Sequence, residues 1–211
     1  RPGVSHWIAE TDGLPLREIT LGGLLREQAA RHPDRPAIIF DEVDPALQAR
    51  WSYGELDSRV DAVAKALMAI GVAHGDRVAV MSPNRPEWVL LEYGLARIGA
   101  VLVTVNPAFR RAELAYLLTQ GRIGGLFVLG AYRGFDLSGM IGAMLEGASR
   151  GGRVDAAAYP NLRWLVQLGD AKVAGAMEFE DFLAAGSTIG RAEFEARMSA
   201  VGARDIAQIQ Y

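Results

Sequence analysis

The sequence contains no cysteine, and this absence excludes disulfide bonds, thiolate nucleophiles and zinc–thiolate sites. Histidine is also scarce. His6, His32 and His74 lie far apart without metal-ligand spacing, so we expect no metal ligand in the chain. Lys65 and Lys172 are the only lysines. A mechanism that needs a buried lysine therefore has few candidates.

Charge and hydropathy exclude two further classes of partner. The net charge of −3 offers no clustered basic face, so we expect no nucleic acid as a partner. The most apolar stretch, residues 89–105, carries Glu92 and Arg97, whereas a membrane-spanning helix needs about 20 apolar residues with almost no charge. We therefore expect no transmembrane segment. The first 13 residues lack a signal-peptide core and begin with Arg1, so we expect a trimmed N-terminus and a cytoplasmic location.

The first third of the chain predicts two helices and one short strand. A helix over residues 21–32, capped by Thr20 and ended near Pro33, should bury Leu21, Leu24, Leu25 and Ala29. Residues 37–40 have strand character. The stretch "SYGE", residues 52–55, forms a capping box that opens a helix over residues 53–70. Its apolar stripe consists of Leu56, Val60, Val63, Leu67 and Ile70, and Gly71 ends it.

Three continuously apolar runs follow, at residues 77–82, 100–105 and 126–130, as expected for strands covered on both faces. Two helices separate them. We expect the first over residues 86–98, with Asn84 as its cap and Pro86 in its first turn, burying Trp88, Leu91, Leu95 and Ile98. The second, over residues 111–120, should bury Leu114, Leu117 and Leu118. This alternation predicts an α/β fold with a doubly wound, mostly parallel sheet flanked by helices.

The hydrophobic patterns that indicate helices and strands are weaker after residue 130. We expect a helix over residues 136–146, a mobile loop over 147–160 and a strand over 162–169. Two helices should follow, over residues 179–185 and 191–200. A last strand, over residues 205–211, should present Ala207, Ile209 and Tyr211 on its apolar face.

A search for catalytic chemistry assigns no catalytic residue, cofactor-binding residue or metal ligand within the chain. The turn after residues 77–82 reads "SPNRPE", with two prolines and no glycine, which is unfavourable for binding a pyrophosphate. No phosphate-loop motif is present. We interpret Glu55 as a capping residue and His74 as exposed and inert. The remaining candidates have structural interpretations, as a solvated first turn or as core positions: Arg110, Arg111, Trp88 and Trp164.

Three motifs nevertheless resemble those of the adenylate-forming enzymes, a superfamily that includes acyl-CoA synthetases, luciferases and peptide-synthetase adenylation domains. They lie at residues 51–67 ("WSYGELDSRVDAVAKAL"), 75–107 (which ends in "VNP") and 205–211 ("DIAQIQY"), in the family's order. The resemblance implies structural roles for Ser52, Tyr53, Glu55, Leu56, Gly99, Asn106 and Pro107. It also implies that Tyr211 abuts an ATP phosphate-binding loop that would begin just after it.

Within the family, "VNP" and "NRPEW" look more like the fatty acyl-CoA synthetase branch. The resemblance implies that residues 1–211 are the first half of the large N-terminal domain of an acyl-CoA synthetase-like fold. The full-length enzyme would use ATP, Mg²⁺ and coenzyme A to activate a fatty acid as acyl-adenylate and transfer it to coenzyme A.

For residues 1–211 alone we expect no bound cofactor and no activity. We also expect self-association through the surfaces that the rest of the enzyme would cover. Two alternatives stay open. The chain could be a non-catalytic α/β binding module, or part of a peptide-synthetase adenylation domain.

Overall fold

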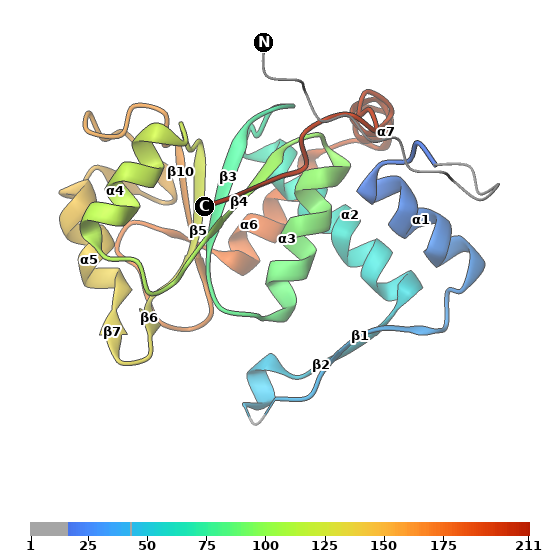
Figure 1. Ribbon diagram of the computed structural model, residues 1–211, viewed down its shortest axis with the longest axis horizontal. Helices are drawn as coiled ribbons and strands as arrows, with labels where there is room; N and C mark the ends of the chain where they lie inside the picture. Colours follow the sequence, from blue (N-terminus) through green and yellow to red (C-terminus); the bar gives the residue numbers. More distant parts are fainter. Residues whose placement is uncertain (1–16, 43) are drawn as a thin grey trace, which may run out of the picture.

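The computed structural model describes residues 17–42 and 44–211, in which a mostly parallel sheet lies between two layers of helices (Figure 1). The expectations for His6 and for the start of the chain fall outside these residues. The parallel strands run in the order β12-β4-β3-β5-β10, and the central three are parallel as predicted. Their bounds are β3 (Arg77–Met81), β4 (Val101–Val105), β5 (Gly125–Leu129), β10 (Trp164–Leu168) and β12 (Gln208–Gln210).

Alternate residues of each central strand enter two separate cores, which explains why the strands are apolar throughout. Val78 and Val80 face one core, and Ala79 and Met81 face the other. The first core packs against α1 (Leu21–Arg31), α2 (Tyr53–Ala69), α3 (Pro86–Arg97), α6 (Phe179–Ala185) and α7 (Arg191–Ser199). The second packs against α4 (Arg111–Gln120) and α5 (Leu137–Leu145). The doubly wound architecture is thus confirmed.

Helix α2 forms as the sequence predicts. The Glu55 backbone N–H donates to Ser52 Oγ at 3.3 Å, and Glu55 Oε2 accepts from the Ser52 N–H at 2.8 Å. Its whole predicted stripe is buried. The helix ends before Gly71, whose φ of 89° lies in the left-handed region that glycine tolerates.

Three local predictions are wrong. The last strand, β12, spans residues 208–210 rather than 205–211, and Tyr211 follows it as an exposed residue instead of lying on a buried apolar face. Helix α3 has Arg85 rather than Asn84 at its N-cap position. Helix α1 leaves Leu21 and Leu24 exposed and buries Gly22 with Leu25 and Ala29 instead. The reason is close approach, because a Cβ added to Gly22 would lie 3.1 Å from the Cα of Arg97 in α3. The glycine contact, rather than the largest side chains, therefore sets the buried face.

Short strands extend the fold beyond the predicted elements. A separate hairpin pairs β1 (Pro36–Phe40) with β2 (Ala49–Ser52), and a 3-10 turn, η1 (Pro45–Leu47), lies between them. Within residues 147–160, β9 (Arg153–Val154) pairs antiparallel with β10, and β8 (Ser149–Arg150) pairs antiparallel with β9. The mobility of this segment stays a prediction. The remaining elements are β6 (Ala131–Tyr132), β7 (Phe135–Asp136), β11 (Met177–Glu178) and the 3-10 turn η2 (Gly186–Thr188).

None of the helices in residues 17–42 and 44–211 combines the length and the apolar run that crossing a bilayer requires.

Candidate functional site

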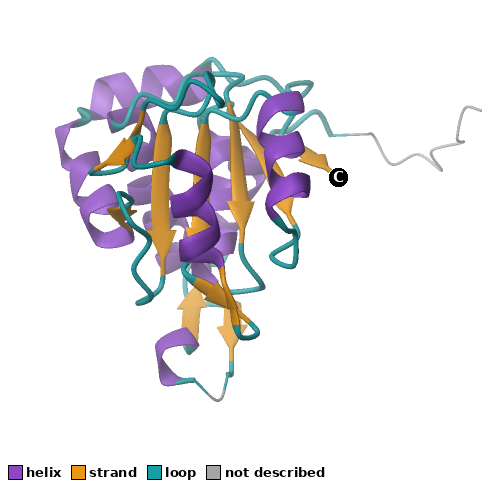
Figure 2. Ribbon diagram, turned by 90° about the vertical axis from the view of Figure 1, so that its left-hand side faces the viewer, coloured by secondary structure: helices purple, strands orange, loops and turns teal. Residues whose placement is uncertain are grey.

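The loops that follow the parallel strands meet along one edge of the sheet, beyond which the β1–β2 hairpin projects (Figure 2). Helix α3 connects β3 to β4 on one face, and α4 connects β4 to β5 on the other. The first connection runs from β3 to β4, and the second runs from β4 back past β3 to β5, so the direction of winding reverses beside β3. In open α/β sheets ligands bind at this kind of switch point, outside the carboxyl ends of the strands. We call this side of the sheet, where the parallel strands end, the carboxyl edge, and it is the candidate functional site.

A polar cavity of about 340 Å³ lies at the carboxyl ends of β5 and β10. The side chain of Arg85 reaches it from the loop after β3, and Arg85 is only 7% exposed. Its Nε and Nη2 donate to the two carboxylate oxygens of Glu87 at 2.7 and 2.8 Å. Gly169, with φ of 70°, leaves room for the guanidinium, because an added Cβ would lie 3.0 Å from Arg85 Nη1. Arg85 is therefore held in one place by its neighbours.

The charges around this cavity do not suit a phosphate. Burial raises the pKa of Glu87, but the hydrogen bonds and the charge of Arg85 outweigh it, so the pKa of Glu87 is lowered. The Arg85 charge is thus already matched, and Asp170 and Glu178 add further acidic groups to the walls. Gln167 Oε1 accepts from the Val173 N–H at 3.0 Å. These contacts supply neither a nucleophile–base pair nor a free cation.

An apolar groove of about 420 Å³ lies at the other side of the edge, between α4 and the end of β12. Phe109, Ala112 and Leu117 line it together with two exposed aromatic residues. Tyr116 is 65% and Tyr211 59% exposed. The groove therefore presents apolar surface beside the last residue of the chain.

The predicted family positions fall into three places. Ser52, Tyr53, Glu55 and Leu56 start helix α2, where they form its cap and enter its buried face. Asn106 and Pro107 follow β4, and Tyr211 follows the neighbouring strand β12, so these three share the carboxyl edge. Asn106 Oδ1 accepts from the Ala108 N–H at 2.9 Å, which turns the chain toward α4. Gly99 lies at the opposite, amino end of β4.

The structure confirms only some of the interpretations that the sequence suggested for other arginine, tryptophan and histidine residues. Arg110 and Arg111 are exposed in and beside the first turn of α4, although the Arg110 guanidinium stacks 3.7 Å over the Phe135 ring. Trp164 is buried and Trp88 half-buried. His74 is exposed as predicted but is not without contacts, because its Nε2 lies 2.8 Å from Asp205 Oδ2. Sequence reasoning could not find this pair or the Arg85 cavity, since each joins residues far apart in the chain.

The described residues do not by themselves fit ATP or its magnesium ion. Lys65 belongs to helix α2 and lies over the Phe194 ring, and Lys172 pairs with Glu178, so both lysines already have partners. In residues 17–42 and 44–211, no group of three or more acidic or histidine side chains could hold a metal. Within the described part of the chain, the edge offers a frame for a nucleotide site but not the phosphate-binding groups.

Comparison with known proteins identifies relatives of this fold. The family model described as AMP-binding enzyme matches residues 25–211. YngI of Bacillus subtilis is 32% identical over 194 residues, covering 91% of this chain and 35% of YngI. The mitochondrial medium-chain acyl-CoA ligase ACSF2 of Mus musculus is 30% identical over 187 residues, covering 87% of this chain and 29% of ACSF2.

Solved structures show the same fold. A long-chain-fatty-acid-CoA ligase from Archaeoglobus fulgidus superposes with a TM-score of 0.64 at 18% identity, covering 94% of this chain and 35% of the ligase. The chain thus spans about a third of the length of the relatives it matches.

Proposed function

The chain belongs to the AMP-binding enzyme family, and from this premise we propose that it is the N-terminal part of an ATP-dependent acyl-CoA ligase. The observation that carries the proposal is the carboxyl edge of the sheet. There Tyr211, at the end of β12, stands beside Asn106 and Pro107, at the end of β4. Residues that follow Tyr211 in a longer protein would enter the place where open α/β sheets bind ligands.

The proposed reaction has two steps. A carboxylate attacks ATP to give an acyl-adenylate and pyrophosphate, and coenzyme A then takes the acyl group and releases AMP. We propose a fatty acid as the carboxylate, with ATP, Mg²⁺ and coenzyme A supplied to the full-length enzyme. The name of ACSF2, a medium-chain acyl-CoA ligase, supports an acyl substrate. A cytoplasmic location stays part of the proposal.

The test is carboxylate-dependent ATP–pyrophosphate exchange by the full-length gene product. We expect exchange with Mg²⁺ and a fatty acid series, and acyl-CoA formation when coenzyme A is added. A matched reaction without fatty acid is the control. Exchange with amino acids only, together with a carrier-protein domain downstream, would support a peptide-synthetase adenylation domain instead. No exchange with any carboxylate would support a non-catalytic module.

Residues 1–211 alone are proposed to be inactive and to self-associate. Two exposed aromatic residues, Tyr116 and Tyr211, support self-association, because they leave an apolar groove open to water. Sedimentation velocity at rising concentrations tests this proposal. We expect concentration-dependent dimers in the parent chain and a weaker dependence in Tyr116→Ser. A monomer at every concentration would contradict it.

A further inference from the structure

Strand β12 is short, and Ile209 is the only one of its three side chains that packs against a core. It spans three residues and pairs with β4 alone among the described strands. The Leu102 N–H donates to the Ala207 carbonyl at 2.9 Å at the start of this pairing. Ile206 and Tyr211, on either side, are 62% and 59% exposed. Edge strands of this length are marginal by themselves, so other contacts must anchor β12.

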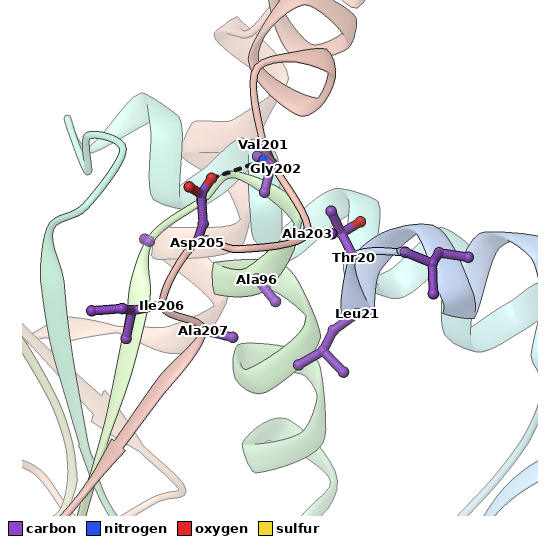
Figure 3. A pocket seen from close by; sticks show the side chains of 12 residues that line it. Thr20, Leu21, Ala96, Val201, Gly202, Ala203, Asp205, Ile206 and Ala207 are labelled. Carbon is purple, nitrogen blue, oxygen red and sulfur yellow. Dashed lines mark hydrogen bonds between the residues drawn. The ribbon is translucent and has the colours of Figure 1, made fainter. Parts of the chain in front are cut away.

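The turn before β12 supplies such an anchor through Asp205. Its backbone N–H donates to the Gly202 carbonyl at 3.1 Å, and its Oδ2 accepts from the Gly202 N–H at 2.8 Å (Figure 3). The same Oδ2 accepts from His74 Nε2 at 2.8 Å. One carboxylate therefore closes its own turn and ties that turn to the segment before β3.

His74 is itself held in place by the backbone beneath it. Its ring lies against Gly99, where an added Cβ would come 2.1 Å from the ring Cδ2. The Gly75 N–H donates to the Gly99 carbonyl at 2.8 Å, so the turn and the start of β4 are joined. On its other side the turn carries Asp76, which pairs with Arg163 ahead of β10 at 2.5 Å. The turn over residues 73–76 therefore contacts the segments that lead into β12 and β10, the two outermost of the parallel strands named above.

We propose that Asp205 is a positioning residue. Held by His74, it fixes where β12 enters the sheet, and therefore where the residues that follow Tyr211 stand at the carboxyl edge. The second half of this statement rests on the proposed function. The contact is partly exposed, and such pairs contribute little to global stability. Its effect is expected to be local, because the pairing of β12 is itself weak.

Amide hydrogen exchange of residues 1–211, followed by NMR, tests the local effect. The Leu102 N–H reports on β12, and the neighbouring Val101 N–H, bonded to the Asp76 carbonyl, reports on the rest of the sheet. Asp205→Ala should speed Leu102 exchange about three- to tenfold, and Asp205→Asn, which keeps an acceptor for Gly202, about two- to fourfold. His74→Gln should resemble Asp205→Asn.

Controls separate this effect from general loss of stability. Val101 exchange should not change in these variants. Glu195→Gln, which breaks an exposed pair with Arg191, should leave Leu102 unchanged. Unchanged Leu102 exchange in Asp205→Ala, or equal acceleration of Val101, would overturn the proposal.

The full-length gene product tests the positioning role. In ATP–pyrophosphate exchange, Asp205→Ala should raise the KM for ATP about three- to tenfold without changing the KM for the carboxylate. Asp205→Glu, which keeps the charge, should restore part of the loss. Equal KM values for ATP would overturn the positioning role. A parent enzyme without exchange would overturn the proposed function and this role together, whereas the Leu102 rates would still decide whether Asp205 anchors β12.

Discussion

The two ends of the parallel sheet are built in opposite ways. At the amino end, a single turn over residues 73–76 joins β3, β4, β10 and the approach to β12, and Gly99 lets the His74 ring pack against its backbone. At the carboxyl end, a polar cavity and an apolar groove stay open, and aromatic side chains face the solvent. The amino end therefore fixes the strands, whereas the carboxyl end leaves polar and apolar surface open.

This difference between the two ends predicts which substitutions should lower the free energy of unfolding most. Buried contacts at the amino end serve the fold, so changes there should lower the free energy of unfolding, whereas the partly exposed His74–Asp205 pair should act locally. Changes at the carboxyl edge should cost the isolated chain less, and they should matter for a ligand.

Helix α2 runs between the two ends of the sheet. Substitutions in it should show the largest difference in the free energy of unfolding. Leu67 is fully buried near the amino end of the sheet, and Ser52 caps the other end of the same helix. Leu67→Ala should cost about 2–4 kcal/mol through the cavity it leaves. Ser52→Ala should cost about 1 kcal/mol through the lost cap. Urea titration measures both, and equal losses would mean that core packing does not dominate here.

Two glycines with similar backbone angles compare the ends directly. Gly99 has φ of 73° and Gly134, in the β6–β7 turn at the carboxyl end, has φ of 77°. Alanine is strained at both, by about 1 kcal/mol or more. At Gly99 its Cβ would also displace the His74 ring, whereas nothing lies within 4 Å at Gly134. We expect Gly99→Ala to cost about 2–3 kcal/mol and Gly134→Ala about 1 kcal/mol. Similar unfolding midpoints for the two variants would contradict the division.

Acid should weaken the fold through carboxylates at both ends. The Gly202 amide and the His74 ring lower the pKa of Asp205, and Arg85 lowers that of Glu87 despite its burial. Since both folded pKa values lie below the unfolded ones, their contribution is present above the unfolded pKa and is lost as the pH falls through the folded one. Urea midpoints from pH 7 down to about pH 3 should therefore fall below about pH 4.

Variants assign this acid dependence to the two groups. Glu87→Gln should flatten the fall below about pH 4, whereas Asp205→Asn should flatten it only slightly, because solvent screens its exposed pair. Glu195→Gln, which changes an exposed pair, is the control and should follow the parent. A fall that is just as steep in both test variants would show that other carboxylates carry it.

Much of the fold could be predicted because its main strands and helices carry strong, local patterns. The runs at residues 77–82, 100–105 and 126–130 have both faces buried, and the α2 stripe repeats at helical spacing. Strands β8 and β9 were missed because two residues cannot show a period. The buried face of α1 depends on contact with Arg97, 75 residues away from Gly22.

The candidate site was harder to predict for the same reason. His74 and Asp205 are 131 residues apart, so only the folded chain brings them together. Arg85 and Gly169 likewise meet across the ends of different strands. By contrast, Asn106 and Pro107 could be placed at a strand end, because they directly follow an apolar run.

We propose that residues 17–42 and 44–211 provide the frame of a nucleotide site without its phosphate-binding groups. Isothermal calorimetry of this chain with ATP and Mg²⁺ tests it most directly, with the full-length gene product as the matched comparison. We predict no measurable heat of binding for residues 1–211 and saturable binding for the full-length protein. Micromolar binding of ATP by residues 1–211 would contradict the claim, because the phosphates would then be held by groups within this chain.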